Sequence, residues 1–244
     1  MSIKQRLRQF LPALASIAVG VLPVVVLIVW FGVPRKLIIG WGVLSYVIGV
    51  AIIKMPLYHV VVVRFLHGKL SHLWLSVSQG LLSAFAELGA AYAFFVLVVP
   101  TLNLPQLIGF GAAAGAVEAI VLPFVQNPFK GTPLEEHASQ VSGKSAGSQA
   151  IDWMSVIERA LAIVVHVASR GLVYLSFSTG NLIPALVAVL TFASIDGRAY
   201  YAHLEKWPFD QVKTLWKFYR YLALVAFVQV ACFSAFYAMA SRID

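Results

Sequence analysis

The sequence predicts an all-α protein, a polytopic transmembrane helical bundle that forms one integral membrane domain over residues 1–244. Three observations support this fold class: 60% of the residues are hydrophobic, only 11% are charged, and the mean hydropathy is +0.85. A typical soluble domain has roughly 25% charged residues, because its surface faces water. The composition therefore excludes a cytosolic enzyme, a secreted disulfide scaffold and a disordered chain, and it predicts a multi-pass protein of the cell membrane.

The individual helices follow from segment length, since about 20 mostly apolar residues cross a bilayer. Seven segments meet this length to within a few residues: 11–32, 38–62, 73–99, 106–125, 153–177, 181–197 and 219–240. The first follows three basic residues and is too long for the apolar core of a signal peptide, so we expect a retained span. Pro34 and the Arg35–Lys36 pair mark its end.

The positive charges favour one orientation of these spans. If the N-terminus is cytoplasmic, 12 of the 18 Lys and Arg residues lie in cytoplasmic segments, 3 lie in outside segments and 3 lie within spans. Cytoplasmic loops carry the excess of Lys and Arg in membrane proteins. We therefore expect the N-terminus inside and the C-terminus outside. Because the charges are dispersed between apolar segments, the net charge of +8 indicates basic loops and no nucleic-acid partner.

Two polar segments separate the spans. Residues 126–152 predict a flexible cytoplasmic loop rich in Gly and Ser, and Asp152 at its end is the predicted N-cap of the fifth span. Residues 203–218 are basic with interleaved aromatic residues, and they predict either an interfacial helix or a simple connector. Cys232 is the single cysteine, so an internal disulfide and a cysteine-based metal cluster are excluded.

Ionisable residues within the spans are the candidates for function, because each costs about 2.5–3.5 kcal/mol on insertion scales and such residues face the bundle interior. There are eight: Lys54, Glu87, Glu118, Glu158, Arg159, His166, Arg170 and Asp196. Glu87, Glu118 and His166 lie near the middle of three consecutive spans. We therefore expect these three side chains to share one membrane level and to converge on a water-filled cavity.

Helical phase indicates which of these residues form structural ion pairs. Arg159, His166 and Arg170 are seven and four residues apart, so they fall on one face of a helix. Glu158 lies about 80° from His166, and we expect it to pair with Arg159 across helices, or with Lys54, and not to contact His166. Lys54, Glu158, Arg159 and Arg170 are the structural ion-pair candidates.

Two carboxylates and an imidazole allow three kinds of chemistry. They can bind a divalent metal, polarise a water with Glu as base and His assisting an oxyanion, or form a proton relay or transport site. Glu118 favours a functional role, because its helix is rich in small residues and carries no cation. The structural alternative to a functional role is an ion pair with Arg170 or Lys54 for Glu87. For His166 it is an interhelical hydrogen bond.

Two motifs carry a family resemblance. GAVEAIVL (115–122) and ERALAIVVH (158–166) resemble the YhfC-type membrane peptidases, distant relatives of the CAAX-protease and bacteriocin-processing group of glutamic intramembrane proteases. FAELGAAY (85–92) and TFASID (191–196) correspond to the first and last elements of that family pattern. The resemblance covers about residues 80–200, roughly half of the chain.

The resemblance implies roles for four predicted catalytic residues. Glu118 and His166 would polarise the hydrolytic water, Glu87 would be the remaining carboxylate, and Asp196 would orient the site or be vestigial. Two departures from the family pattern leave open whether such a peptidase is active, altered or inactive. The first element has one Glu where the family generally has a pair, and Phe192 stands where the final His would be.

Three functions remain as hypotheses. The first is an intramembrane peptidase-like protein that acts on a membrane protein or peptide, with no cofactor or with one divalent metal. The second is a catalytically degenerate scaffold that serves as a non-enzymatic subunit among partners in a membrane complex. The third is a proton-coupled transporter. The peptidase requires Glu87, Glu118 and His166 around one water, whereas a cation paired with Glu118 favours the scaffold.

Overall fold

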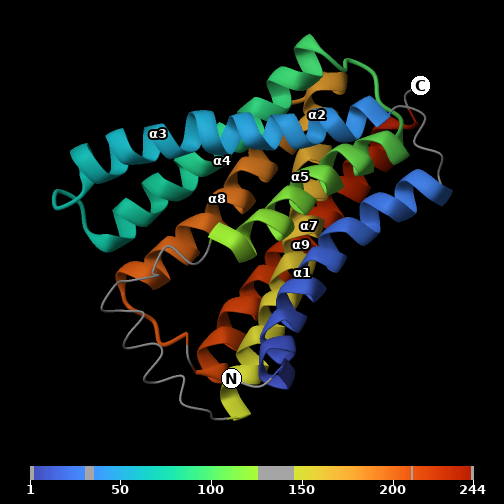
Figure 1. Cartoon of the computed structure of the whole chain (residues 1–244). Coiled ribbons are helices and arrows are strands. Elements are labelled where there is room, and N and C mark those ends of the chain that lie inside the picture. The colour runs from blue at the N-terminus through green and yellow to red at the C-terminus, as the bar shows by residue number, and fades with distance from the viewer. Residues whose placement is uncertain (1–2, 31–35, 126–145, 210, 243–244) are drawn as a thin grey trace.

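A computed structural model of the whole chain describes residues 3–30, 36–125, 146–209 and 211–242. Within these ranges every regular element is a helix, which confirms the all-α prediction. The elements are α1 (Ile3–Trp30), α2 (Lys36–Val47), η1 (Ile48–Lys54), α3 (Met55–Leu57), η2 (Tyr58–Leu66), α4 (His72–Leu97), α5 (Leu104–Val125), α7 (Ala146–Thr179), α8 (Ile183–Leu204) and α9 (Val212–Ala240). The run from α2 to η2 lies across the bundle, and α1, α5, α7 and α9 lie side by side beneath it (Figure 1).

The helices have the length and composition of a multi-pass membrane protein. Six are long and apolar enough to span a bilayer: Leu37–Leu66, His72–Leu97, Leu104–Val121, Val156–Thr179, Ile183–Leu204 and Val212–Ala240. Each coincides with one of the segments expected from hydropathy. Residues 11–30 of the predicted first span lie in α1, and residues 31–32 lie outside the described residues. The apolar part of α1, Leu14–Val29, is shorter than the other six helices. The number of seven spans and the orientation of the chain in the membrane therefore stay predictions.

The second membrane helix has an irregular hydrogen-bond register that the sequence did not predict. The π-helical segments η1 and η2 flank the short α3, and Pro56 lies at this junction. Proline has no N–H to donate and its ring crowds the preceding turn, so a regular α-helical ladder cannot pass through this position. Lys54 is the last residue of η1 and directly precedes α3. Single π-helical turns inside α-helices are frequent at functional sites.

The start of α7 corrects one prediction. Its first residue is Ala146, so Asp152 lies inside the helix and is not its N-cap. The Gly- and Ser-rich composition of 146–152 is typical of a loop, but tertiary context overrides such weak propensities and the helix includes these residues. The rest of the predicted loop, 126–145, lies outside the described residues. The basic segment 203–218 is not one helix, because α8 ends at Leu204 and α9 begins at Val212.

Helix α7 is the centre of the bundle, packed against α1, α4, α5, α8 and α9. Small residues allow its close contact with α5. A Cβ added at Gly111 would lie 2.6 Å from Val167 Cα, and one at Gly115 would lie 2.8 Å from Ile163 Cα. Glycine at these two positions therefore brings the backbones together, as at other membrane helix interfaces. The contact places Glu118, one turn beyond Gly115, against the middle of α7.

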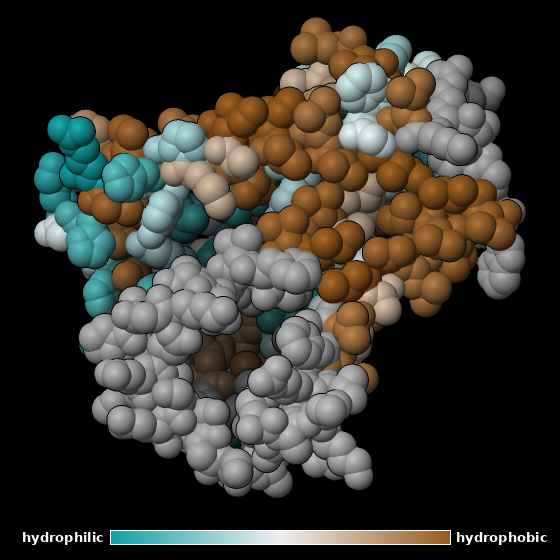
Figure 2. All heavy atoms as spheres, in the orientation of Figure 1, coloured by the Kyte–Doolittle hydropathy of each residue, from teal (hydrophilic) through white to brown (hydrophobic). Residues whose placement is uncertain are grey.

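The outer surface is strongly apolar. Leu97, Leu182 and Phe227 have 79%, 77% and 70% of their surface exposed, and many other large hydrophobic residues are exposed with them. Figure 2 shows this apolar surface as a continuous brown area over the upper part of the molecule. Exposed apolar area of this extent marks a surface that faces lipid or a partner. A set of polar side chains is nevertheless buried inside, among them Glu87, Arg159, His166 and Arg170.

Candidate functional site

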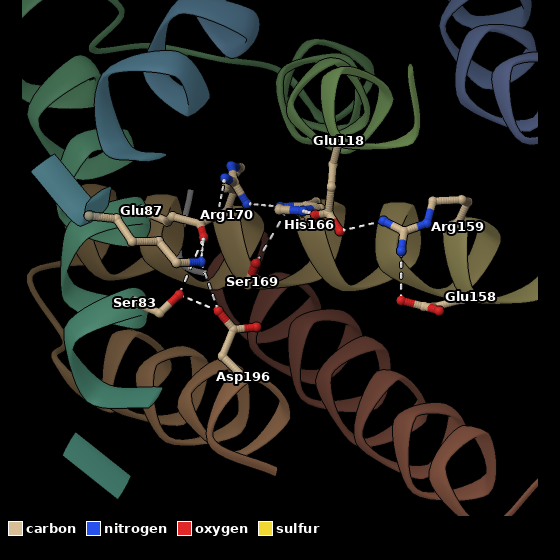
Figure 3. A network of polar contacts seen from close by, with 10 residues as sticks. Ser83, Glu87, Glu118, Glu158, Arg159, His166, Ser169, Arg170 and Asp196 are labelled. Atoms are coloured by element: carbon tan, nitrogen blue, oxygen red, sulfur yellow. Dashed lines mark hydrogen bonds and ion pairs between the residues drawn. The ribbon is translucent and has the colours of Figure 1, made fainter. Parts of the chain in front are cut away.

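All eight ionisable residues predicted from the sequence belong to one set of contacts, some of them buried and some partly exposed, which also includes Ser83. We call this set the polar network; its members are Lys54, Ser83, Glu87, Glu118, Glu158, Arg159, His166, Arg170 and Asp196. They come from η1, α4, α5, α7 and α8, and they point toward one another in the interior of the bundle (Figure 3). The network has two halves, which Arg170 connects.

Glu118 is the centre of the first half. Its Oε1 accepts a hydrogen bond from Arg159 NH1 at 2.8 Å, and its Oε2 lies 2.7 Å from His166 Nε2. Arg159 also donates through NH2 to Glu158 Oε1 at 2.6 Å. The remaining oxygen of Glu158 accepts a hydrogen bond from the Tyr219 hydroxyl on α9 at 3.1 Å. The expected absence of a Glu158–His166 contact is consistent with these pairings, although Glu158 pairs along its own helix.

Lys54 is the centre of the second half. Its Nζ donates to Glu87 Oε1 at 2.8 Å and to Asp196 Oδ2 at 3.0 Å, so it joins α4 to α8. The Ser83 hydroxyl contacts both carboxylates, with Glu87 Oε1 at 3.4 Å. Ser83 precedes Glu87 by four residues and so shares its helix face, a spacing that could have identified it from the sequence.

Arg170 connects the halves and fixes the proton on His166. Its NH2 lies 3.7 Å from Glu87 Oε2, and its NH1 lies 2.5 Å from His166 Nδ1. A guanidinium only donates hydrogen bonds, so His166 Nδ1 must be an acceptor without a proton. The imidazole is therefore neutral, and Nε2 carries the hydrogen that is donated to Glu118. His166 has no free lone pair with which to take a proton from water.

The charges of the network do not cancel. It contains three permanent cations, on Lys54, Arg159 and Arg170, and four carboxylates, while His166 is neutral. The network thus has one negative charge in excess when every carboxylate is ionised. Each carboxylate nevertheless contacts a cation: Glu87 and Asp196 contact Lys54, and Glu118 and Glu158 contact Arg159.

A pocket of about 100 Å³ borders the first half of the network. Its polar lining consists of Glu118, Glu158, His166 and Asp196, and its other residues are apolar or aromatic. Phe192 is among them, with its ring 5.8 Å from that of His166. A space of this size and polarity has room for several waters. Glu118 and His166 thus meet the pocket together, with Asp196 across from them on α8.

The structure brings together only part of the predicted catalytic set. Glu118 and His166 are in direct contact, and Asp196 borders the same pocket. Glu87 does not line this pocket and reaches His166 only through Arg170. Sequence reasoning missed Tyr219, since a lone tyrosine near the start of a helix carries no signal of a carboxylate partner on another helix.

Metal binding finds limited support in this arrangement. Among the described residues, no group of three or more His, Cys, Asp or Glu side chains has the geometry to hold a metal ion. The acceptor atoms of Glu118 face Arg159 and His166, both of which donate to them.

Comparison with known proteins adds no relative: no family model, no curated protein and no solved structure matches this chain. The resemblance to the YhfC-type peptidases therefore stays a prediction from short motifs.

Proposed function

We propose that the chain is an intramembrane hydrolase of the peptidase type, in which Glu118 activates a water held in the pocket. The observation that supports the proposal is the direct contact of Glu118 with His166 at the wall of a pocket that has both polar and apolar lining residues. Asp196 and Phe192, which correspond to the last element of the family pattern, border the same pocket. Motifs from three separate helices therefore meet at one place.

The chemistry assigns different tasks to the two residues. Glu118 accepts a proton from water while the water oxygen bonds to the carbonyl carbon of the substrate, and the proton then passes to the leaving amine as the C–N bond breaks. Each carboxylate oxygen has two lone pairs, so Glu118 can accept this proton while it is bonded to Arg159 and His166. His166 presents an N–H, so it stabilises negative charge and cannot be the base. Asp196 orients the water from α8.

A cleavage assay with an isotopic label tests this role. The full chain is reconstituted into vesicles with membrane proteins and peptides, and incubated in water enriched in oxygen-18. Hydrolysis places one water oxygen in each new carboxylate, so products acquire the label at their C-termini. We expect labelled products from the unchanged chain and at least a 100-fold lower yield from Glu118→Gln, the order of loss expected for a general base.

Glu205→Gln is the matched control, because Glu205 is an exposed carboxylate that pairs with His72 away from the pocket. It should give the same yield as the unchanged chain. Equal labelling by the Glu118→Gln chain, eluting and melting as a folded protein, would reject the proposed base.

The scaffold hypothesis is the second candidate, and two observations favour it: Glu118 pairs with the cation of Arg159, and Glu87 does not line the pocket that Glu118 and His166 border. The condition stated above for the peptidase, three side chains around one water, is therefore met by Glu118 and His166 alone. Contacts between carboxylates and cations of different helices are suited to holding helices together. This hypothesis expects the chain to be recovered from native membranes with stable partner subunits, and Glu118→Gln to leave that association intact. Purification as a single species from its own membranes would count against it.

We also propose seven spans, with α1 as the first, the N-terminus in the cytoplasm and the C-terminus outside. Single-cysteine labelling tests this topology in a Cys232→Ser background. Ser71 directly precedes α4 and Ser241 directly follows α9; both are exposed and lie at predicted opposite sides of the membrane. We expect a membrane-impermeant maleimide to label Ser241→Cys in intact cells and to spare Ser71→Cys. The reverse pattern would invert the orientation.

A further inference from the structure

A second cluster of charged and aromatic residues lies where the chain turns from α8 into α9. The Arg198 guanidinium lies 4.3 Å from the ring centre of Tyr221 and 5.4 Å from that of Trp207. Lys217 Nζ lies 5.4 Å from the same Trp207 ring. We call these four residues the α8–α9 elbow. Cations from two helices thus converge on one indole in the connection between them.

The position of the elbow follows from the helices that flank it. Helices α8 and α9 are both long and apolar enough to cross a bilayer, so the connection between them lies at a membrane surface, whichever side that is. Trp and Tyr are enriched at this level, where an amphipathic ring contacts both headgroups and acyl chains. The elbow therefore faces lipid headgroups.

Among the described residues, no acidic side chain forms an ion pair with the cations of the elbow. Within the described part of the chain, neither Arg198 nor Lys217 makes an ion pair, and the Nε of Arg198 is buried without a hydrogen-bond partner. Lys213, Lys217 and Tyr221 are four residues apart, so a further exposed lysine lies on the same face of α9. An aromatic ring attracts each cation through its π face, but it does not neutralise their charge.

We propose that the α8–α9 elbow binds the phosphate of an anionic phospholipid headgroup. A phosphate accepts hydrogen bonds from both the planar guanidinium fork and an ammonium group. Trp207 and Tyr221 hold the two cations at headgroup level and supply apolar contact for the lipid beneath. This site is separate from the pocket beside Glu118, and it does not depend on whether the chain is an enzyme.

Native mass spectrometry of the full chain in detergent tests the site, with phosphatidylglycerol and phosphatidylcholine titrated separately. A Lys or Arg near an anionic surface contributes about 1 kcal/mol, which is roughly a fivefold change in affinity. We expect tighter retention of phosphatidylglycerol than of phosphatidylcholine. The double variant Arg198→Gln/Lys217→Gln should weaken phosphatidylglycerol binding about 25-fold and leave phosphatidylcholine binding unchanged.

Arg64→Gln/Lys69→Gln is the matched control, because it removes two exposed cations, one in the last turn of η2 and one in the connection between η2 and α4. It should keep most of the lipid preference. Equal loss in the two double variants, or equal affinity of the unchanged chain for both lipids, would overturn the proposal. Release of the lipid by soluble glycerol phosphate at the same concentration would assign the site to free phosphate esters, and would also overturn it.

The single variant Lys217→Gln replaces an exposed helical residue, and it provides the test if the double variant does not fold. It should weaken phosphatidylglycerol binding about fivefold. Unchanged binding in this variant would contradict the site.

Discussion

Glu87 offers the sharpest test of the polar network, because its charge can be removed at constant shape. Its side chain is 4% exposed, accepts from Lys54 at 2.8 Å and lies 3.7 Å from Arg170 NH2. Glu87→Gln leaves the wholly buried Arg170 without a carboxylate contact among the described residues, whereas Lys54 keeps Asp196 at 3.0 Å. The uncompensated charge on Arg170 therefore dominates the expected loss.

The magnitude follows from the cost of breaking a buried ion pair, about 3–5 kcal/mol when one partner is removed. Since Lys54 retains a partner and the Arg170 contact is long, we expect about 3 kcal/mol for Glu87→Gln. Arg170→Met should cost a similar amount, because it leaves Glu87 with Lys54 alone. The double variant removes both charges and should cost at least about 2 kcal/mol less than the sum of the single variants.

Reversible unfolding in mixed micelles, followed by circular dichroism as the denaturing detergent fraction rises, gives these free energies. Glu205→Gln provides the baseline, since Glu205 and His72 are 40% and 53% exposed and such surface pairs contribute under about 1 kcal/mol. Losses that add to within about 0.5 kcal/mol would refute the coupling of Glu87 and Arg170. A Glu87→Gln chain as stable as Glu205→Gln would refute the buried pairing altogether.

Three further predictions concern the remaining contacts. Arg170→Met frees Nδ1 of His166, so nitrogen NMR of labelled histidine should change from one neutral tautomer to a mixture; an unchanged spectrum would contradict the assigned proton position. Gly111→Ala should lower the unfolding free energy by about 1–3 kcal/mol, because the added Cβ contacts the α7 backbone. Gly89→Ala is the control: an added Cβ there has no atom within 4 Å, so this variant should be neutral or stabilising. Equal effects of the two variants would argue against the close helix contact. Tyr219→Phe removes one donor to the partly buried carboxylate of Glu158 and should cost about 1 kcal/mol. The same unfolding titration measures this cost, and no loss would contradict that bond.

The sequence predicted the membrane helices because hydropathy over 20 residues depends on composition alone. Their irregularities were not predictable in the same way. The π-helical run around Pro56 has the same apolar composition as an α-helix, and a change from i→i−4 to i→i−5 bonding leaves no mark in hydropathy. The early start of α7 at Ala146 was missed for a related reason, since its first turns are polar and extend beyond the apolar span.

The sequence predicted which residues are candidates for the site, but it did not predict which carboxylate contacts which cation. A charged side chain within a span is costly in lipid, so each one stands out in the sequence and needs a partner of opposite charge. The sequence therefore predicts Lys54 and Arg170 as possible partners of Glu87. Which carboxylate meets which cation depends on how the helices pack. The sequence shows no cation on the helix of Glu118, and Arg159 on α7 supplies one from another helix.

The position of Lys54 in the chain sets an order for assembly during synthesis. Glu87 follows it by 33 residues, but Asp196 follows it by 142. At roughly 5–20 residues per second, the ribosome completes that interval in about 7–28 s. Lys54 enters the bilayer with Glu87 as its first available partner, and α4 must therefore join the second helix early. The contact between Lys54 and Asp196 can form only after α8 has been synthesised. The polar network is therefore completed only when most of the chain has been made.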